Sequence, residues 1–131
     1  MYLRTLLQSP TIQISFDHKN DWLYAEWIGD QSLETVQEGC LQMLDYMKAE
    51  RCNKVLNDNR LVTSMWSDAA EWGGHVWFPA MKGAGLEYFA WVYSPNVFSR
   101  LSTDLTLQHT TQPVVLTFDS MDTAQAWLKQ M

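Results

Sequence analysis

Two stretches of the chain carry residues with the types and spacing that chemistry needs. The first is Asp58-Asn59-Arg60, at the polar end of an apolar run. Alternate residues of a strand point to the same side, so Asp58 and Arg60 can pair with each other. We favour a structural ion pair that fixes the following loop. The functional alternative is that Arg60 presents its guanidinium fork to an acidic ligand or partner.

The second stretch is "LVTSMWSDAAEW" (61–72), in which Ser67 stands at the expected start of a helix. Serine is a leading N-cap residue, and such a cap is worth roughly 1 kcal/mol, so we favour that role. The alternative is phosphorylation of the Ser67 hydroxyl. A helix N-terminus would favour the phosphate, whereas the neighbouring Asp68 would disfavour it. Ser64 and Thr63 are lesser candidates for the same modification.

The histidines predict no metal site. His75 follows Glu71 by four positions, which is the spacing of a solvated contact on a helix. A bound zinc needs three or four ligands, and neither His18 nor His109 is placed by spacing to join this pair. No nucleophile–base signature, glycine-rich phosphate loop, GxSxG or CxxC motif is present. The sequence therefore predicts no catalytic residue, no metal and no cofactor.

Aromatic residues gather in and around the helical region that follows Ser67. Packing against a sheet accounts for part of this group, but a helix cannot bury aromatics on every side. We expect the remainder to form a contact surface or to line a pocket. Together with the polar residues at the expected strand ends, the candidate binding residues are Asp58, Asn59, Arg60, Trp66, Trp72, His75 and Asn96.

Hydrophobic periodicity places these residues on an α/β fold. Period-two runs at 11–16 and 22–28 predict an antiparallel hairpin, and a three-to-four-residue period from 32 to 50 predicts a helix. Strand, helix and strand signals then alternate to a closing helix, which requires parallel strands with right-handed crossovers. The prediction is a mixed five-stranded sheet with about four flanking helices. The expected segments are strands 54–59, 88–93 and 113–118, a broken helix 67–84, and helices 94–107 and 120–131.

Composition limits the function. With 131 residues and 47% hydrophobic content, the chain fits one domain, 1–131. A net charge of −6 without a basic cluster argues against nucleic-acid binding. No run is long enough for a membrane span, and the N-terminus lacks a secretory signal. Cys40 and Cys52 match no metal motif and are expected to be buried free thiols in the cytoplasm.

The order β-β-α-β-α-β-α-β-α, with a polar loop after the third strand, resembles the STAS domain, whose bacterial members include the SpoIIAA-type anti-sigma-factor antagonists. "VLNDNR" and "GLEYFAWVYS" are similar to the SpoIIAA-like set, which has CRAL-TRIO-like relatives. In the antagonists, a partner kinase phosphorylates a serine that follows an aspartate at the start of the second helix. The resemblance places Ser67 on that serine. Here Trp66 replaces the aspartate, and Asp68 and Ala69 replace the small residues that usually follow.

These observations predict a noncatalytic regulatory module that docks a protein partner through the second helix and the adjoining loop, with phosphorylation at Ser67 left open. An exposed aromatic helix would also allow a homodimer. The alternative is a module that binds a small apolar or acidic ligand in a pocket lined by Trp and Met, with Arg60 or His75 at its mouth. An enzyme has the least support, because no spacing holds a base near a nucleophile.

Overall fold

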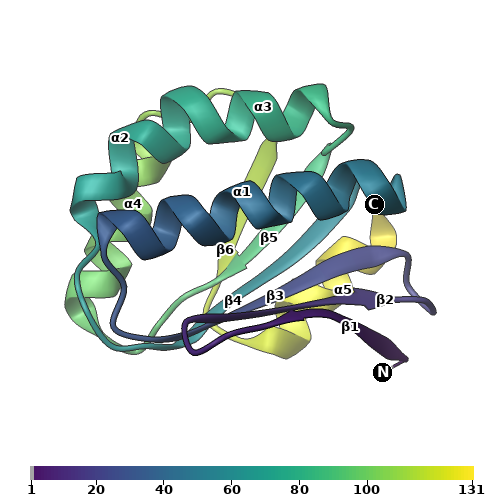
Figure 1. Cartoon of the computed structure of the whole chain (residues 1–131), viewed down its shortest axis with the longest axis horizontal. Coiled ribbons are helices and arrows are strands. Elements are labelled where there is room, and N and C mark those ends of the chain that lie inside the picture. The colour runs from purple at the N-terminus through teal and green to yellow at the C-terminus, as the bar shows by residue number, and fades with distance from the viewer. Residues whose placement is uncertain (1) are drawn as a thin grey trace.

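A mixed sheet with helices on both faces organises the computed structural model, which describes residues 2–131 (Figure 1). The elements are β1 (Leu3–Gln8), β2 (Ile12–Asp17), β3 (Trp22–Gly29), α1 (Leu33–Glu50), β4 (Lys54–Val62), α2 (Ala70–Trp72), α3 (Phe78–Gly83), β5 (Tyr88–Val92), α4 (Val97–Gln108), β6 (Val114–Phe118) and α5 (Met121–Gln130). A 3₁₀ turn (Ser67–Ala69) precedes α2, and a π-helical turn (Gly73–Trp77) joins α2 to α3.

The strands lie in the sheet in chain order, β1-β2-β3-β4-β5-β6. The first three are antiparallel neighbours, and β3 to β6 run parallel through helical crossovers, which confirms the expected hairpin and βαβ units. The expectation of five strands is wrong, because β1 adds a sixth at the edge. Most side chains of β1 are exposed, so main-chain pairing with β2 forms it without a period-two pattern. A register shift between Thr5 and Leu7 further disturbs the pattern.

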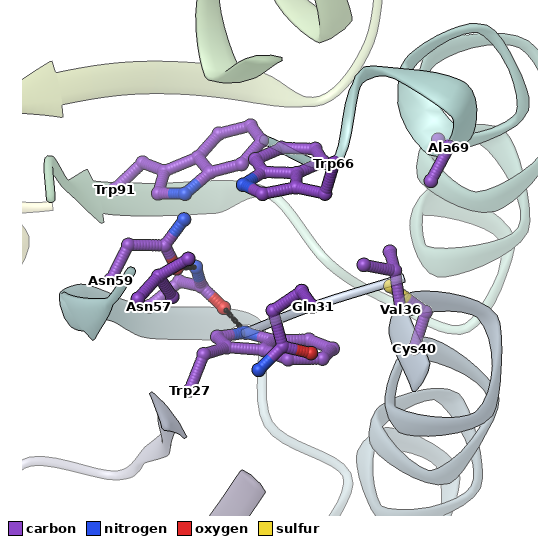
Figure 2. Close-up of a pocket in the computed structure, with 11 residues that line it drawn as sticks. Trp27, Gln31, Val36, Cys40, Asn57, Asn59, Trp66, Ala69 and Trp91 are labelled. Carbon is purple, nitrogen blue, oxygen red and sulfur yellow. Dashed lines mark hydrogen bonds between the residues drawn. The ribbon is translucent and has the colours of Figure 1, made fainter. Parts of the chain in front are cut away.

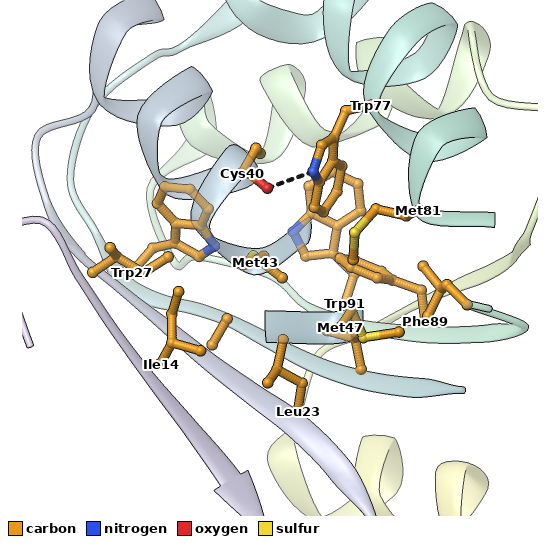
Figure 3. Packing of buried hydrophobic residues seen from close by; sticks show 14 of the residues in the cluster. Ile14, Leu23, Trp27, Cys40, Met43, Met47, Trp77, Met81, Phe89 and Trp91 are labelled. Atoms are coloured by element: carbon orange, nitrogen blue, oxygen red, sulfur yellow. Dashed lines mark hydrogen bonds between the residues drawn. The ribbon is translucent and has the colours of Figure 1, made fainter. Parts of the chain in front are cut away.

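Helix α1 packs its apolar stripe on one face of the sheet. Ser32 caps its first turn through a capping box with Thr35, and Arg51 ends it in the left-handed conformation. The main core lies between this helix, α3 and the sheet (Figure 3). There the Trp77 indole N–H donates to the Cys40 carbonyl oxygen at 2.7 Å. Helix α5 covers the opposite face with Ala124 and Leu128.

The 3₁₀ turn, α2, the π-helical turn and α3 follow one another without a break in the chain. We call this run, residues 67–83, the segmented helix. The expected break in this helix is confirmed: it begins at Gly73 and takes the form of the π-helical turn. A Cβ atom on Gly74 would lie 2.5 Å from the Cβ of His109. Glycine therefore allows the C-terminal end of α4 to approach this turn.

Helix α4 packs chiefly against the segmented helix. Its buried residues are small and polar: Ser99, Ser102, Thr103 and Thr106. Two of them bind Trp66, because Ser102 Oγ accepts from the Trp66 backbone N–H at 3.0 Å and Ser99 Oγ accepts from its indole N–H at 3.2 Å. These bonds fix the start of the segmented helix against α4.

Candidate functional site

Asp58 is the centre of a hydrogen-bond cluster on the sheet face that α5 covers. Its side chain is 1% exposed. Asp58 accepts from the Tyr24 hydroxyl at 2.7 Å, and from Arg60 Nε at 3.0 Å and Arg60 Nη2 at 2.9 Å. The Arg60 backbone N–H adds a fourth bond at 3.0 Å. The predicted Asp58–Arg60 pair is therefore confirmed, and both of its residues lie within β4.

Electrostatics in this cluster fix the protonation states. Burial, reinforced by the bond to Asp58, raises the pKa of Tyr24 far above its ordinary value. The hydrogen bonds to Asp58 raise the pKa of the Arg60 guanidinium, which already exceeds any physiological pH. Tyr24 is therefore a neutral donor and Arg60 a cation. The Arg60 side chain is half exposed, so part of its guanidinium faces solvent.

The opposite face of the same strands carries a second set of polar residues. Trp27 Nε1 donates to Asn57 Oδ1 at 2.9 Å, and Asn57 Nδ2 donates to Asn59 Oδ1 at 3.1 Å. Trp91, on the neighbouring β5, has a buried indole N–H without a partner among the described residues. We call these four residues the Trp–Asn ladder. They come from β3, β4 and β5, on the face beneath α1.

The Trp–Asn ladder lines an internal cavity of about 40 Å³ between α1, the sheet and the start of the segmented helix (Figure 2). The remaining walls are Gln31, Val36, Cys40, Val62, Trp66, Ala69 and Gly73. Asn59 and Trp66 are thus buried around a cavity and do not form an exposed docking surface. The expected pocket lining of Trp and Met is half right, since three Trp but no Met line it. Neither Arg60 nor His75 lines it: Arg60 is bonded to Asp58 on the opposite face of β4, and His75 contacts His109.

The hydroxyl of Ser67 does not cap a helix. The residue before the 3₁₀ turn is Trp66, and no side chain caps that turn, so the N-cap prediction is wrong. Ser67 lies one position too late and instead lines an open groove of about 450 Å³ at the N-terminal end of α1. The lesser candidates are both hydrogen-bonded: Thr63 donates to Asp30 at 2.5 Å, and Ser64 Oγ accepts from the Gln31 backbone N–H at 2.8 Å.

His75 contacts a histidine and not Glu71. His75 Nε2 lies 3.1 Å from His109 Nδ1, across the junction between the π-helical turn and the end of α4. The expectation that His109 stands apart is wrong, because spacing along the chain does not show that α4 returns to the segmented helix. No group of three potential His, Cys, Asp or Glu ligands occurs in residues 2–131. Trp72 is half-buried at the rim of the main core.

Asn96 caps α4, accepting from the backbone N–H groups of Phe98 and Ser99 at 3.0 Å each. Ser94, two residues earlier, is not this cap. Ser94 instead donates to the Val62 carbonyl oxygen at 2.6 Å, and Asn96 Nδ2 donates to the Thr63 carbonyl oxygen at 3.2 Å. These bonds tie the start of α4 to the loop after β4.

Sequence reasoning missed the outward face of α4 and three members of the ladder. Four large apolar side chains of α4 are exposed: Val97 (61% exposed), Phe98 (53%), Leu101 (51%) and Leu105 (38%). Their helical spacing is visible in the sequence, but it predicts a buried face. The alternation of Asn57 and Asn59 is a signal for a second polar set on β4. Trp27 and Trp91 carry no comparable signal.

Architecture and site together define an α/β protein with a polar cluster on each face of its central strand. This arrangement, an antiparallel hairpin followed by parallel βαβ units, is consistent with the STAS-like fold and confirms the predicted fold class. Among solved structures, SiaC of Pseudomonas aeruginosa is similar to 90% of this chain, over 100% of its own length, with a TM-score of 0.51 and 14% sequence identity. At that identity the similarity shows the fold alone. No family model and no curated protein matches the chain.

Proposed function

We propose that this protein is a noncatalytic regulatory module that binds an apolar helix of a protein partner on the outward face of α4. The inverted amphipathicity of this helix carries the proposal. Helices on the surface of a globular protein normally bury their apolar stripe, whereas α4 buries Ser and Thr and exposes Val, Phe and Leu. A contiguous exposed apolar face of this kind is typical of an interaction site.

The charged residues of α4 leave this face uncharged. Arg100 pairs with Asp119 at 3.0 Å and stacks on the Tyr93 ring at 4.0 Å, and Asp104 accepts from the Tyr93 hydroxyl at 2.5 Å. Both charges are therefore held on the side toward β5 and β6. Phe98, Leu101 and Leu105 keep the three- and four-residue spacing with which one helix packs along another.

Leu61, near the end of β4, and Met65, in the loop after it, are two further exposed apolar side chains. They are 50% and 48% exposed, and hydrogen bonds from the start of α4 hold this loop. The sequence predicted docking through the second helix and the loop that adjoins it. The proposed surface retains that loop but uses α4 in place of the second helix. Arg60 supplies a cation near the same edge of the sheet, where a partner carboxylate can pair with it.

Control by phosphorylation at Ser67 belongs to the same proposal. Ser67 is accessible from the groove beside α1, and Trp66 next to it is bonded to α4. A phosphate there would meet the like charges of Glu34 and Asp68, which line the same groove, and would push the segment outward. The proposal extends to a cytoplasmic location, which two free thiols fit. No helix in residues 2–131 is long and apolar enough to cross a membrane.

The test compares Leu101→Asp with Leu41→Asp. Both leucines are 51% exposed on helices, so the two variants carry the same change in charge and exposure. Tagged protein is purified from its native host, and proteins recovered with it are quantified by mass spectrometry. We expect one partner to be recovered with the wild type and with Leu41→Asp, and to be lost from Leu101→Asp.

The recovered partner is then purified, and its binding is measured by titration calorimetry. We expect Leu101→Asp to weaken it at least about tenfold, which corresponds to about 1.4 kcal/mol. Equal binding by both variants would contradict the proposal. Light scattering on the purified protein distinguishes a second copy of this chain from a different partner. Peptide mapping of the same sample, with Ser67→Ala as its control, reports whether Ser67 carries phosphate.

A further inference from the structure

His75 and His109 meet where the π-helical turn lies against the C-terminal end of α4. His75 Nε2 is 3.1 Å from His109 Nδ1, and the centres of the two rings are 4.8 Å apart. His75 is exposed and His109 half-buried, so solvent reaches the pair. Two imidazole nitrogen atoms that face each other at such a distance can share a proton or bind one metal ion.

The separation of the two rings fits a pair of metal ligands better than a straight hydrogen bond. A straight N–H···N bond of 3.1 Å would place the ring centres about 5.4 Å apart, and hydrogen bonds prefer such a geometry. Two imidazoles that bind one ion at roughly 2.0–2.1 Å, with an angle of about 90–109° between them, have nitrogen atoms about 2.8–3.4 Å apart and ring centres about 4.5–5.3 Å apart. Both observed distances lie within these ranges.

The backbone at this junction allows the two histidines to approach. His75 lies in the π-helical turn, and such turns are frequent at functional sites. His109 is the C-cap residue of α4. Between them stands Gly74, where a Cβ atom would lie 2.5 Å from the Cβ of His109 and 2.7 Å from its carbonyl carbon. Any larger residue at position 74 would therefore displace His109 from His75.

We propose that His75 Nε2 and His109 Nδ1 bind one divalent transition-metal ion of the Zn²⁺ or Cu²⁺ type. Imidazole nitrogen suits these ions, whereas Mg²⁺ and Ca²⁺ prefer oxygen. No third His, Cys, Asp or Glu within residues 2–131 joins the pair, so water completes the coordination from the solvent side. The net charge of −6 favours the approach of a cation. Spacing along the chain predicted no metal site, because only the fold brings His109 to His75.

A bound ion links the segmented helix to α4. One ligand belongs to the π-helical turn and the other to the end of α4, and unfolding separates them. The ion therefore binds the folded protein in preference to the unfolded chain and stabilises it. Neither histidine is one of the apolar residues proposed to dock a partner, so this inference does not rest on the proposed function.

The first test titrates the protein with Zn²⁺ in a calorimeter, with Mg²⁺ as the control ion. We expect one Zn²⁺ per chain and no binding of Mg²⁺. His75→Ala and His109→Ala should each weaken Zn²⁺ binding at least about tenfold, because the loss even of an outer partner of a metal site has an effect of this size. His18→Ala should leave binding unchanged, since His18 lies in the turn between β2 and β3, where it accepts from Arg4.

The second test identifies the ligand atoms and the role of the backbone. In ¹⁵N NMR, Zn²⁺ should shift His75 Nε2 and His109 Nδ1 along a common saturation curve. Gly74→Ala removes no ligand but should also weaken Zn²⁺ binding. Gly83→Ala is its matched control, because a Cβ atom there meets nothing within 4 Å. Circular dichroism shows whether each variant folds, and Zn²⁺ should raise the melting temperature of the wild type but not of the two histidine variants.

The proposal is overturned if His75→Ala and His109→Ala bind Zn²⁺ as tightly as the wild type does. It is equally overturned if only one of these variants loses binding, since a single surface histidine that holds an adventitious ion gives that result. Should Gly74→Ala fail to fold, the two histidine variants still decide, because they truncate side chains outside the buried core.

Discussion

The two faces of β4 treat buried polar groups in opposite ways. Toward α5, Asp58 accepts from the Tyr24 hydroxyl and from the Arg60 guanidinium. Toward α1, Asn57 and Asn59 connect two indoles and leave a donor unpaired beside a cavity. Residues adjacent in sequence thus belong to a closed cluster on one side of the sheet and to an open one on the other.

The difference comes from the functional groups. A carboxylate offers about four acceptor sites and no donor, so one Asp58 can satisfy a hydroxyl and a guanidinium together. A carboxamide carries as many donors as acceptors and cannot absorb an excess of either. Asp58 therefore satisfies the donors that it meets, whereas the two amides leave the buried indole N–H of Trp91 without an acceptor among the described residues. The following measurements test this distinction.

Replacing Asp58 should have the largest effect. Asp58→Ala leaves the buried Tyr24 hydroxyl with only the longer bond to Glu26, at 3.2 Å, and frees Arg60. We expect a loss of about 3 kcal/mol in the free energy of unfolding, measured by urea denaturation. Arg60→Ala should cost less than about 1 kcal/mol, because a half-exposed partner is screened by solvent. Equal losses would show that the cluster does not centre on the carboxylate.

The two ends of the Trp–Asn ladder should differ. Trp27→Phe and Trp91→Phe remove similar volumes. Only Trp27→Phe breaks an existing hydrogen bond, which leaves Asn57 Oδ1 without its donor. We expect Trp27→Phe to be the more destabilising by roughly 1–2 kcal/mol, measured in the same urea series. If Trp91→Phe proved as costly, the Trp91 N–H would have an acceptor in the free protein.

The smallest expected effect is a loss of unfolding free energy at alkaline pH. Because the pKa of Tyr24 is raised in the folded state, its stabilising contribution is complete below about pH 10, the ordinary tyrosine pKa. Above that pH the unfolded state releases a proton that the folded state keeps, so stability falls. Buried Cys40, whose thiol pKa is also raised, contributes to the same fall. Tyr24→Phe should therefore reduce, without abolishing, the loss of unfolding free energy between pH 10 and about 11.

Most of the fold follows from local patterns in the sequence. Alternation identified β2 and β3, and the stripe of Val36, Cys40 and Met47 identified α1. The edge strand β1 was not predicted, because main-chain pairing with β2 forms it and its side chains show no period-two pattern. The outward direction of the apolar face of α4 was not predicted either, for the opposite reason. Its apolar stripe is clear, but periodicity shows which residues share a face and not which way that face points.

The contacts of the candidate site likewise include some that local sequence patterns predict and others that they do not. The Asp58–Arg60 pair depends on neighbours two positions apart, so strand geometry alone predicts it. The contact of His75 with His109 and the ladder from Trp27 to Trp91 join segments distant in sequence. They depend on how α4 crosses the segmented helix and on the relative register of β3, β4 and β5, which no local pattern contains.

The alternation along β4 has a consequence for how the sheet assembles. A slip of one residue against β3 and β5 would turn the Asp58 carboxylate, together with Arg60, toward the indole-lined cavity and place an amide where the Tyr24 hydroxyl donates to a carboxylate. The central strand is therefore aligned by chemical identity as well as by shape, and mispaired sheets are penalised on both faces at once.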